Sequence, residues 1–174
     1  REALAANPVM EQSVLDRLKN GNSLEEIQRL VEEEGAEGLY HLGQLVGCVK
    51  RAHDIDANLS AHVMHENLVS KASSVLALLN VIHVTGIDRN QVEYVIDCAE
   101  EACGDINQRG GGNFAKSAAE IAGLNNASGS DCRAFCAAPA HAMIEAAALV
   151  ASGAYHTVVV TAGGCTAKLG MNGK

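Results

Sequence analysis

Two cysteines, Cys132 and Cys136, lie in the stretch SDCRAFCAAPAHAM, which runs directly into a series of small apolar residues. That series predicts a helix over 137–151, so Cys136 would lie where the helix begins. The first turn of a helix leaves backbone N–H groups unpaired and carries the positive end of the helix dipole. Both features stabilise a thiolate and the oxyanion of a thioester intermediate. Cys136 is therefore a candidate nucleophile for acyl transfer.

The same cysteines also allow plainer interpretations. A free cysteine is usually a small buried hydrophobic residue, and this alternative stays open for Cys136. For Cys132, in the turn before it, packing is the favoured interpretation. A zinc site is disfavoured because Cys132-x3-Cys136 and Cys98-x4-Cys103 lack the paired CxxC spacing of such sites.

Two other stretches carry residue types that bind ligands in some proteins. His62 and His65 lie one turn apart on a predicted helix without a carboxylate signature between them, which favours an ordinary surface or core role. The glycine run QRGGGN at 108–113 could hold a phosphate on backbone N–H groups, with Arg109 as an anion contact. It lacks the lysine of a P-loop and does not directly follow a strand, which favours a tight turn. We therefore expect no metal and no cofactor.

The amino-acid composition argues against several classes of function. The 174 residues include 13 Lys and Arg against 21 Asp and Glu, and the net charge of −8 argues against nucleic acid or an anionic membrane surface as a partner. With no Trp, three Tyr and two Phe, the chain has few rings for stacking on bases. We expect no apolar run long enough to cross a membrane and no signal peptide. Six cysteines without a secreted disulfide framework indicate a reducing cytoplasm.

The first 37 residues are charged and differ in composition from the rest, so we expect 1–37 to form a helical N-terminal extension. Asn7-Pro8 predicts a helix over 9–18, and the capping box Ser23-x-x-Glu26 predicts a second helix over 24–33.

Beyond the extension, apolar periodicity predicts a hairpin over 39–49 and then alternating helices and strands. The predicted helices span 58–84, 113–122 and 137–151, and the predicted strands span 92–98, 126–130 and 156–162. This order predicts an α/β fold with a mostly parallel sheet covered by helices.

The part of the chain from residue 92 onward resembles the first half of a thiolase-fold condensing enzyme, with the β-ketoacyl synthase III type nearest. In that family the nucleophilic cysteine ends a strand and opens the central helix, which runs to a Ser-Gly-Ala before the next apolar strand. Cys136, the SGA at 152–154 and the apolar strand at 158–162 occupy those places. The resemblance implies that Cys136, and not Cys132, is the nucleophile.

A closer resemblance covers 38–174 and is carried above all by the stretches RGGGNFAKSAAE and RAFCAAPAHA. Both are similar to the beta subunit of component C of glycine/sarcosine/betaine reductase. In that family, component C receives a carboxymethyl group held on a selenocysteine of selenoprotein A, forms an acetyl thioester, and yields acetyl phosphate when phosphate cleaves it. The resemblance implies as partners an alpha subunit and selenoprotein A, in the cytoplasm of an anaerobic amino-acid fermenter. Whether this subunit or its partner carries the thioester is left open.

The resemblance also implies that this chain holds part of a site. Condensing enzymes complete the site with His and Asn, or a second His, from the second half of the fold, and none of the seven histidines here matches those positions. We therefore interpret 38–174 as a thiolase-like half-domain of a longer chain, inactive alone and with exposed apolar surface. The alternatives are a non-catalytic structural subunit, or a condensing-enzyme-like acyltransferase acting on other thioesters.

The predicted strand before Cys136 leads us to expect that two copies of the chain associate. In thiolase-like folds that strand lies near the twofold axis and pairs antiparallel with its copy. Here it is the predicted strand over 126–130, built of small residues without a Lys or Pro guard. We therefore expect a homodimer through the strand near Ser128, although small residues that merely lead into the helix are the alternative.

Overall fold

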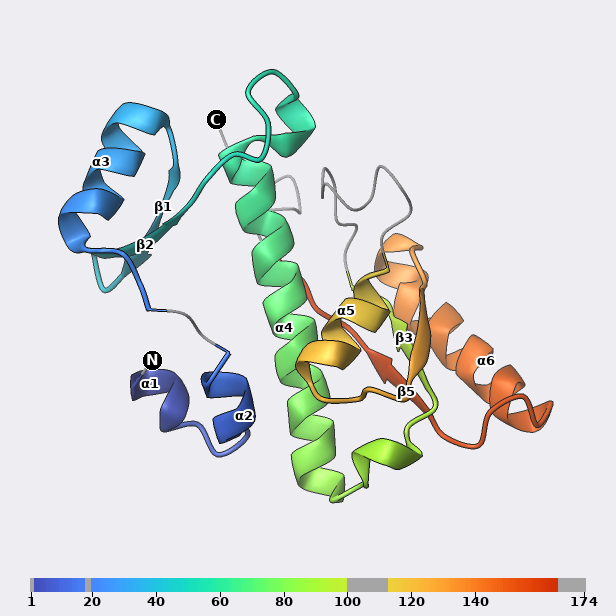
Figure 1. The fold of residues 1–174 in the computed structure, drawn as a ribbon. Coiled ribbons are helices and arrows are strands. Elements are labelled where there is room, and N and C mark those ends of the chain that lie inside the picture. The colour runs from blue at the N-terminus through green and yellow to red at the C-terminus, as the bar shows by residue number, and fades with distance from the viewer. Residues whose placement is uncertain (1, 18–19, 100–112, 166–174) are drawn as a thin grey trace. The chain divides into compact units, whose positions relative to one another are not determined.

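The structure is a computed structural model that describes residues 2–17, 20–99 and 113–165 (Figure 1). The chain divides into two compact units, one with residues 1–18, 69–101 and 113–174 and the other with 19–68 and 102–112. Cys136 belongs to the first. The domain boundary expected after residue 37 stays a prediction.

The N-terminal segment forms two short helices, α1 (Glu2–Ala5) and α2 (Gln12–Leu15), and not the helix predicted over 9–18. The Asn7 side-chain oxygen accepts a hydrogen bond from the Val9 N–H at 3.1 Å, which makes a turn around Pro8. This local bond competes with a helix start, and the regular helix begins only at Gln12.

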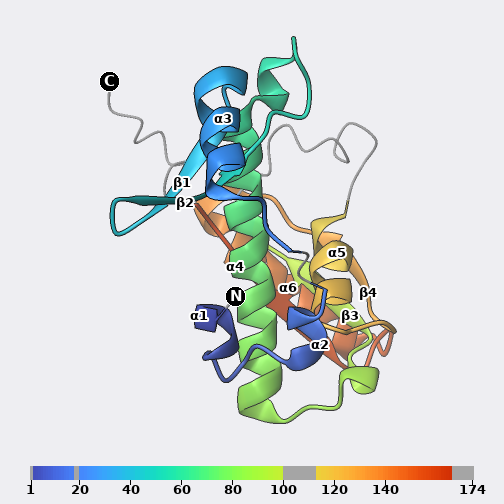
Figure 2. The ribbon, with the colours of Figure 1, turned by 60° about the vertical axis from the view of Figure 1, so that its left-hand side comes forward.

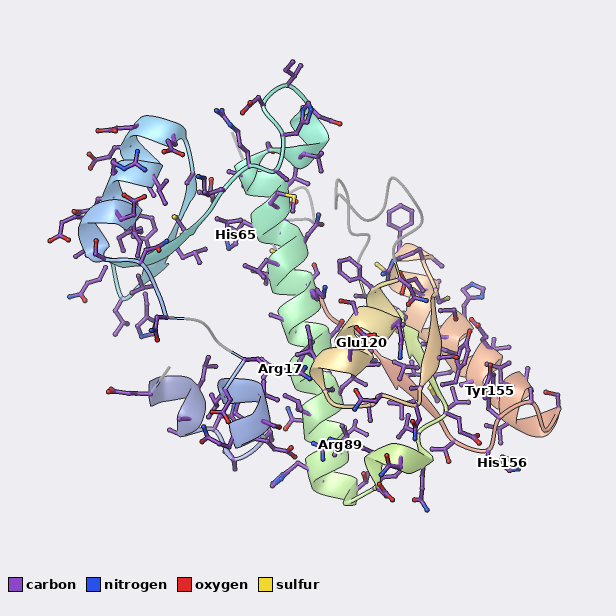
Figure 3. The ribbon with its side chains drawn as sticks, in the orientation of Figure 1. Arg17, His65, Arg89, Glu120, Tyr155 and His156 are labelled. Carbon is purple, nitrogen blue, oxygen red and sulfur yellow. The ribbon has the colours of Figure 1, made fainter. Side chains whose placement is uncertain are left out.

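The same segment packs beside α4 (Ala61–Thr85) and α5 (Phe114–Ile121) within its unit (Figure 2). Arg17 donates to the Glu120 carbonyl at 3.1 Å, and Arg89 donates to the Ala122 carbonyl at 3.0 Å (Figure 3). Both arginines therefore bond carbonyl groups at the end of α5.

The other unit contains α3 (Leu24–Glu34) and a hairpin of β1 (Glu37–His41) and β2 (Gln44–Val49). The predicted cap of α3 is confirmed, because the Ser23 hydroxyl accepts from the Glu26 N–H at 3.2 Å. The predicted hairpin is confirmed as well. Its turn places Leu42 and Gly43 at positive φ, as a tight two-residue turn between antiparallel strands requires.

The sheet that positions the cysteine region has three parallel strands in the order β4-β3-β5. Its strands are β3 (Tyr94–Asp97), β4 (Ser128–Asp131) and β5 (Val158–Thr161). Figure 1 shows α6 (Ala138–Ala151) on one face of this sheet and α4 with α5 on the other. The α/β class with a parallel sheet covered by helices is thereby confirmed.

The two faces receive alternate residues of the same strands. On the α4 and α5 face, Val95 joins a core with Leu78 and Leu79, and all three side chains are essentially inaccessible. On the α6 face, Ile96 packs against Ala138 and Ala142 in a smaller cluster. One side of α6 is therefore buried against the sheet. Its other side exposes large apolar residues, Met143, Ile144 and Val150.

Helix α4 is 25 residues long and apolar enough, by length and composition alone, to cross a membrane. The expectation that no stretch meets that criterion was wrong. Core helices pass the same test, however, and Leu78 and Leu79 of α4 are each 1% exposed. The apolar character of α4 after residue 68 is therefore explained by the core of the unit that contains Leu78 and Leu79.

Candidate active site around Cys136

Cys136 is exposed and lies in a short 3-10 helix, η4 (Phe135–Ala137), which leads directly into α6. The connection from β4 to η4 is only three residues long, so the cysteine stays close to the carboxyl end of the parallel strands. Ligands and reacting groups collect at that end of parallel sheets. Its role as a nucleophile stays a prediction, but its place at the start of a helix agrees with the sequence.

The N–H groups in front of α6 are fewer than the sequence analysis expected. The Ala137 N–H donates to the Ala134 carbonyl at 3.1 Å, and the Ala138 N–H donates to the Phe135 carbonyl. Pro139 has no N–H to offer. Ala140, in the first turn of α6, and Cys136 itself carry the remaining candidate N–H donors for an oxyanion, because the first turn of a helix generally leaves such groups without intrahelical acceptors.

Cys132 lies half-buried on the α6 side of the sheet, where it packs against Ile96 and Ala138. Its sulfur lies 3.7 Å from the Ala138 carbonyl oxygen. This position agrees with packing as its role. The neighbouring Cys98 thiol donates to the Thr161 carbonyl at 3.3 Å, and burial raises the pKa of Cys98 above its usual value. Cys98 is thus kept as a neutral thiol.

The structure adds a polar group that sequence reasoning missed, centred on Asp97 at the end of β3. The Asp97 carboxylate is fully buried and accepts hydrogen bonds from the Ser74 hydroxyl at 2.8 Å and from Arg133 Nη1 at 2.8 Å. Burial raises the pKa of Asp97, while the bonds from Ser74 and Arg133 act in the opposite direction. Asp97 therefore depends on both partners to remain charged.

Asp131, at the end of β4, extends this group to the start of α5. Its two carboxylate oxygens accept the N–H groups of Phe114 and Ala115 at 3.0 and 2.9 Å, which caps that helix. Arg133 Nη2 lies 3.2 Å from the Asp131 carboxylate. One arginine, three residues before Cys136, thus lies between acidic groups that end two neighbouring strands.

One signal in the sequence could have found this group. Each of the three parallel strands ends in a polar residue, namely Asp97, Asp131 or Thr161. Carboxyl ends of adjacent parallel strands meet at one edge of the sheet, so polar residues there lie close together.

The other sequence candidates contribute little to this site. Cys103, Arg109 and all of the glycine run except Asn113 lie outside the described residues. Asn113 caps α5 by accepting the Lys116 N–H at 2.7 Å, which is a structural role. His62 lies 3.1 Å from the Glu66 carboxylate in the other unit. In the described parts of the chain, no group of three or more His, Cys, Asp or Glu is placed to hold a metal ion.

Within the described ranges, no hydrogen bond joins Cys136 to a histidine. The arrangement can present a thiol next to a helix start and hold its loop on a charged network.

Comparison with known proteins identifies a close relative. The chain is 58% identical over 171 residues to "Glycine/sarcosine/betaine reductase complex component C subunit beta" of Peptoclostridium acidaminophilum. The alignment covers 98% of this chain but 33% of that protein, so the chain spans about a third of its relative's length. The resemblance to the component C beta subunit is thereby confirmed.

Among solved structures, the chain is similar to the priming β-ketosynthase of the R1128 polyketide biosynthetic pathway. That match has 26% sequence identity and a TM-score of 0.44, and it covers 53% of this chain and 27% of the ketosynthase. No protein-family model matches the chain.

Proposed function

We propose that this chain is part of the beta subunit of component C in a glycine, sarcosine or betaine reductase complex, and that Cys136 carries an acetyl group as a thioester. The observation that carries the proposal is the 58% identity over 98% of the chain. The exposed position of Cys136 before α6 supports the assignment of the thioester to this residue. A half-domain of a thiolase-like fold is the architecture we propose for 38–174.

The chemistry assigned to Cys136 is acyl transfer without a net change in oxidation state. A phosphate oxygen attacks the carbonyl carbon of the acetyl thioester, the carbon–sulfur bond breaks, and the sulfur leaves as a thiolate. The products are acetyl phosphate and the free cysteine. In the tetrahedral intermediate, the N–H groups of Ala140 and Cys136 would face the oxyanion, and the dipole of α6 would stabilise both oxyanion and thiolate.

The reductive formation of that thioester from a carboxymethyl group belongs, in this proposal, to the assembled complex. The proposed partners are the alpha subunit of component C and selenoprotein A, in the cytoplasm. The described residues supply no base to Cys136, so we expect the 174-residue chain alone to be inactive in acyl transfer.

A non-catalytic structural subunit is the competing function, and the lack of a described hydrogen bond between Cys136 and a histidine favours it. Alkylation separates the two. A thiol activated at a helix start reacts with iodoacetamide at a pH well below about 8.5, the pKa of an ordinary cysteine. Mass spectrometry of the chain, labelled at several pH values, would follow each cysteine separately. The half-buried Cys48 of the hairpin serves as the internal control.

The proposal expects Cys136 to label at least tenfold faster than Cys48 at pH 7. Equal rates for the two cysteines, after allowance for their exposure, would favour the structural role.

A further inference from the structure

The residue before Cys136 holds an unusual backbone conformation. Phe135 has a φ of +49°, in the left-handed region that bulky residues rarely adopt. The other non-glycine residue with positive φ in the described chain, Leu42, lies in a hairpin turn that requires it. Phe135 lies in no such turn, and its ring is 86% exposed, so burial of the side chain does not compensate for the strain. Its surroundings must therefore hold the backbone in place.

On the carboxyl side of Phe135, the backbone is held by η4 and α6. The N–H groups of Ala137 and Ala138 bond back to the carbonyls of Ala134 and Phe135. The Ala138 side chain is 1% exposed and packs against the sheet. These contacts hold the start of α6. They do not fix the backbone on the amino side of Phe135.

On the amino side, Arg133 supplies that anchor. Its Nη1 donates to the Asp97 carboxylate at 2.8 Å, and it also approaches two main-chain carbonyls, those of Asp97 at 3.2 Å and Ala99 at 2.9 Å. A cation that only neutralised the buried Asp97 would need the carboxylate contact alone. The contacts to main-chain oxygens at the end of β3 fix the position of the arginine side chain, and through it the backbone of its own loop.

We propose that Arg133 is a positioning residue, which holds the loop between β4 and η4 so that Phe135 stays left-handed and Cys136 is presented at the start of α6. The role of Arg133 in holding the loop is independent of the proposed function. Only its consequence for Cys136 rests on that function. Arg133 does not touch the reacting atoms in this proposal. It acts through the backbone.

The structural part of the proposal is tested by amide hydrogen exchange in the full chain carrying Arg133→Met. The Ala137 and Ala138 amides report the turn at Phe135, and the Leu124 amide, bonded to the Ala119 carbonyl at 2.8 Å, reports the core. We expect at least tenfold faster exchange at the first two and an unchanged rate at Leu124. Arg51→Met, which removes an exposed arginine in the other unit, is the matched control and should change none of the three.

Because Arg133→Met leaves Asp97 buried without its cation, the variant could lose its fold altogether. Arg133→Lys keeps the charge but loses the second guanidinium nitrogen, Nη2, which lies 3.2 Å from the Asp131 carboxylate while Nη1 bonds Asp97. It should stay folded and still speed exchange at Ala137 and Ala138 by several-fold. Exchange within twofold of the unchanged chain in Arg133→Lys and in any folded Arg133→Met protein would overturn the proposal.

The consequence for Cys136 is read from its rate of alkylation by iodoacetamide at pH 7, relative to that of Cys48. If Arg133 positions the thiol, Arg133→Lys should lower this relative rate by several-fold. Leu79→Ala, which weakens the core elsewhere, should leave the relative rate unchanged, because lower stability alone does not alter the local geometry. A relative rate changed equally by both variants would reduce Arg133 to a stabilising residue.

A double-variant cycle adds a test of the strain itself. Glycine adopts the left-handed conformation without strain, so in a Phe135→Gly background the loop needs less restraint. Arg133→Lys should then change the Ala137 and Ala138 exchange rates by a smaller factor than in the original chain, and equal factors would contradict the link between the two residues. Should Cys136 prove unreactive in the original chain, the proposed function fails, while the exchange rates still decide the role of Arg133.

Discussion

The two faces of the β4-β3-β5 sheet are covered by helices of different character. Under α4 and α5, Val95 of β3 and Val92, just before that strand, join a core that excludes solvent completely at both residues. Under α6 the contact is made mainly by alanines, and the far side of that helix leaves Met143 62% and Ile144 68% exposed. The first face is a finished core. The second face is covered by α6, whose outer side is also apolar. That outer side is a surface suited to packing against a further layer of protein.

The largest expected difference between the faces is energetic. Leu79→Ala, on the α4 side, removes a side chain that is 1% exposed and should lower the free energy of unfolding by about 3 kcal/mol. Leu149→Ala, the same change on the half-buried side of α6, should cost about 1 kcal/mol, because less surface is lost from contact. Urea unfolding of both variants measures this. Equal losses would show that α6 is packed as tightly as α4.

A smaller effect concerns the pH dependence of stability through Asp97. Its pKa in the folded chain lies above the usual 3.8, so between these values the folded state binds more protons than the unfolded state. The contribution of Asp97 to stability is therefore present below its unfolded pKa and falls as the pH rises through the folded pKa. Asp97→Asn removes this titration.

The stability advantage of the original chain over Asp97→Asn should consequently shrink as the pH rises from about 4 toward 7. Urea unfolding at several pH values provides the comparison. An advantage that grows with pH would mean that the Arg133 contact outweighs burial and lowers the pKa of Asp97.

The smallest effect on folding is expected at the edge of the sheet. Within the described residues β4 is an edge strand, and Ser128 on it is exposed, as pairing with a second copy requires. Ser128→Glu would place two like charges opposite each other across a twofold axis and should shift the chain toward monomer in sedimentation. The free energy of unfolding of the monomer should change by no more than about 0.5 kcal/mol.

Asn80→Glu, on the exposed side of α4, adds the same charge away from the strand and is the matched control. If both variants sediment like the unchanged chain, the interface does not involve β4.

Local signals in the sequence predicted most of the elements. The cap Ser23 acts through backbone geometry within a few residues, and the helices predicted over 58–84 and 113–122 are followed by Gly86 and Gly123, which the structure places at positive φ. The same kind of signal misled at Asn7, where an Asx turn formed in place of a helix start. Both outcomes use one side-chain oxygen and one nearby N–H, so a short sequence window does not distinguish them.

The parts of the site that escaped prediction depend on contacts between distant residues. Arg133 and Asp97 are 36 residues apart and meet only because β3 and β4 are adjacent and in register. The glycine at position 129 is also explained by contacts between residues distant in the sequence. A Cβ on Gly129 would lie 2.7 Å from the Val95 carbonyl oxygen and 3.0 Å from the Ala115 Cβ. Packing within the chain therefore explains why residue 129 has no Cβ. The argument for a dimer through the edge strand β4 then depends on Ser128 alone.

The central claim is that Cys136 carries the acetyl group. The most direct measurement supplies isotopically labelled acetyl phosphate to the complete component C, quenches in acid and locates the label by peptide mass spectrometry. The Cys136 thiolate attacks the acetyl carbonyl, phosphate leaves, and the label should be found on the peptide containing Cys136, with its loss in Cys136→Ser. Label on a cysteine of the partner subunit, retained in Cys136→Ser, would contradict the claim and leave this chain a structural role.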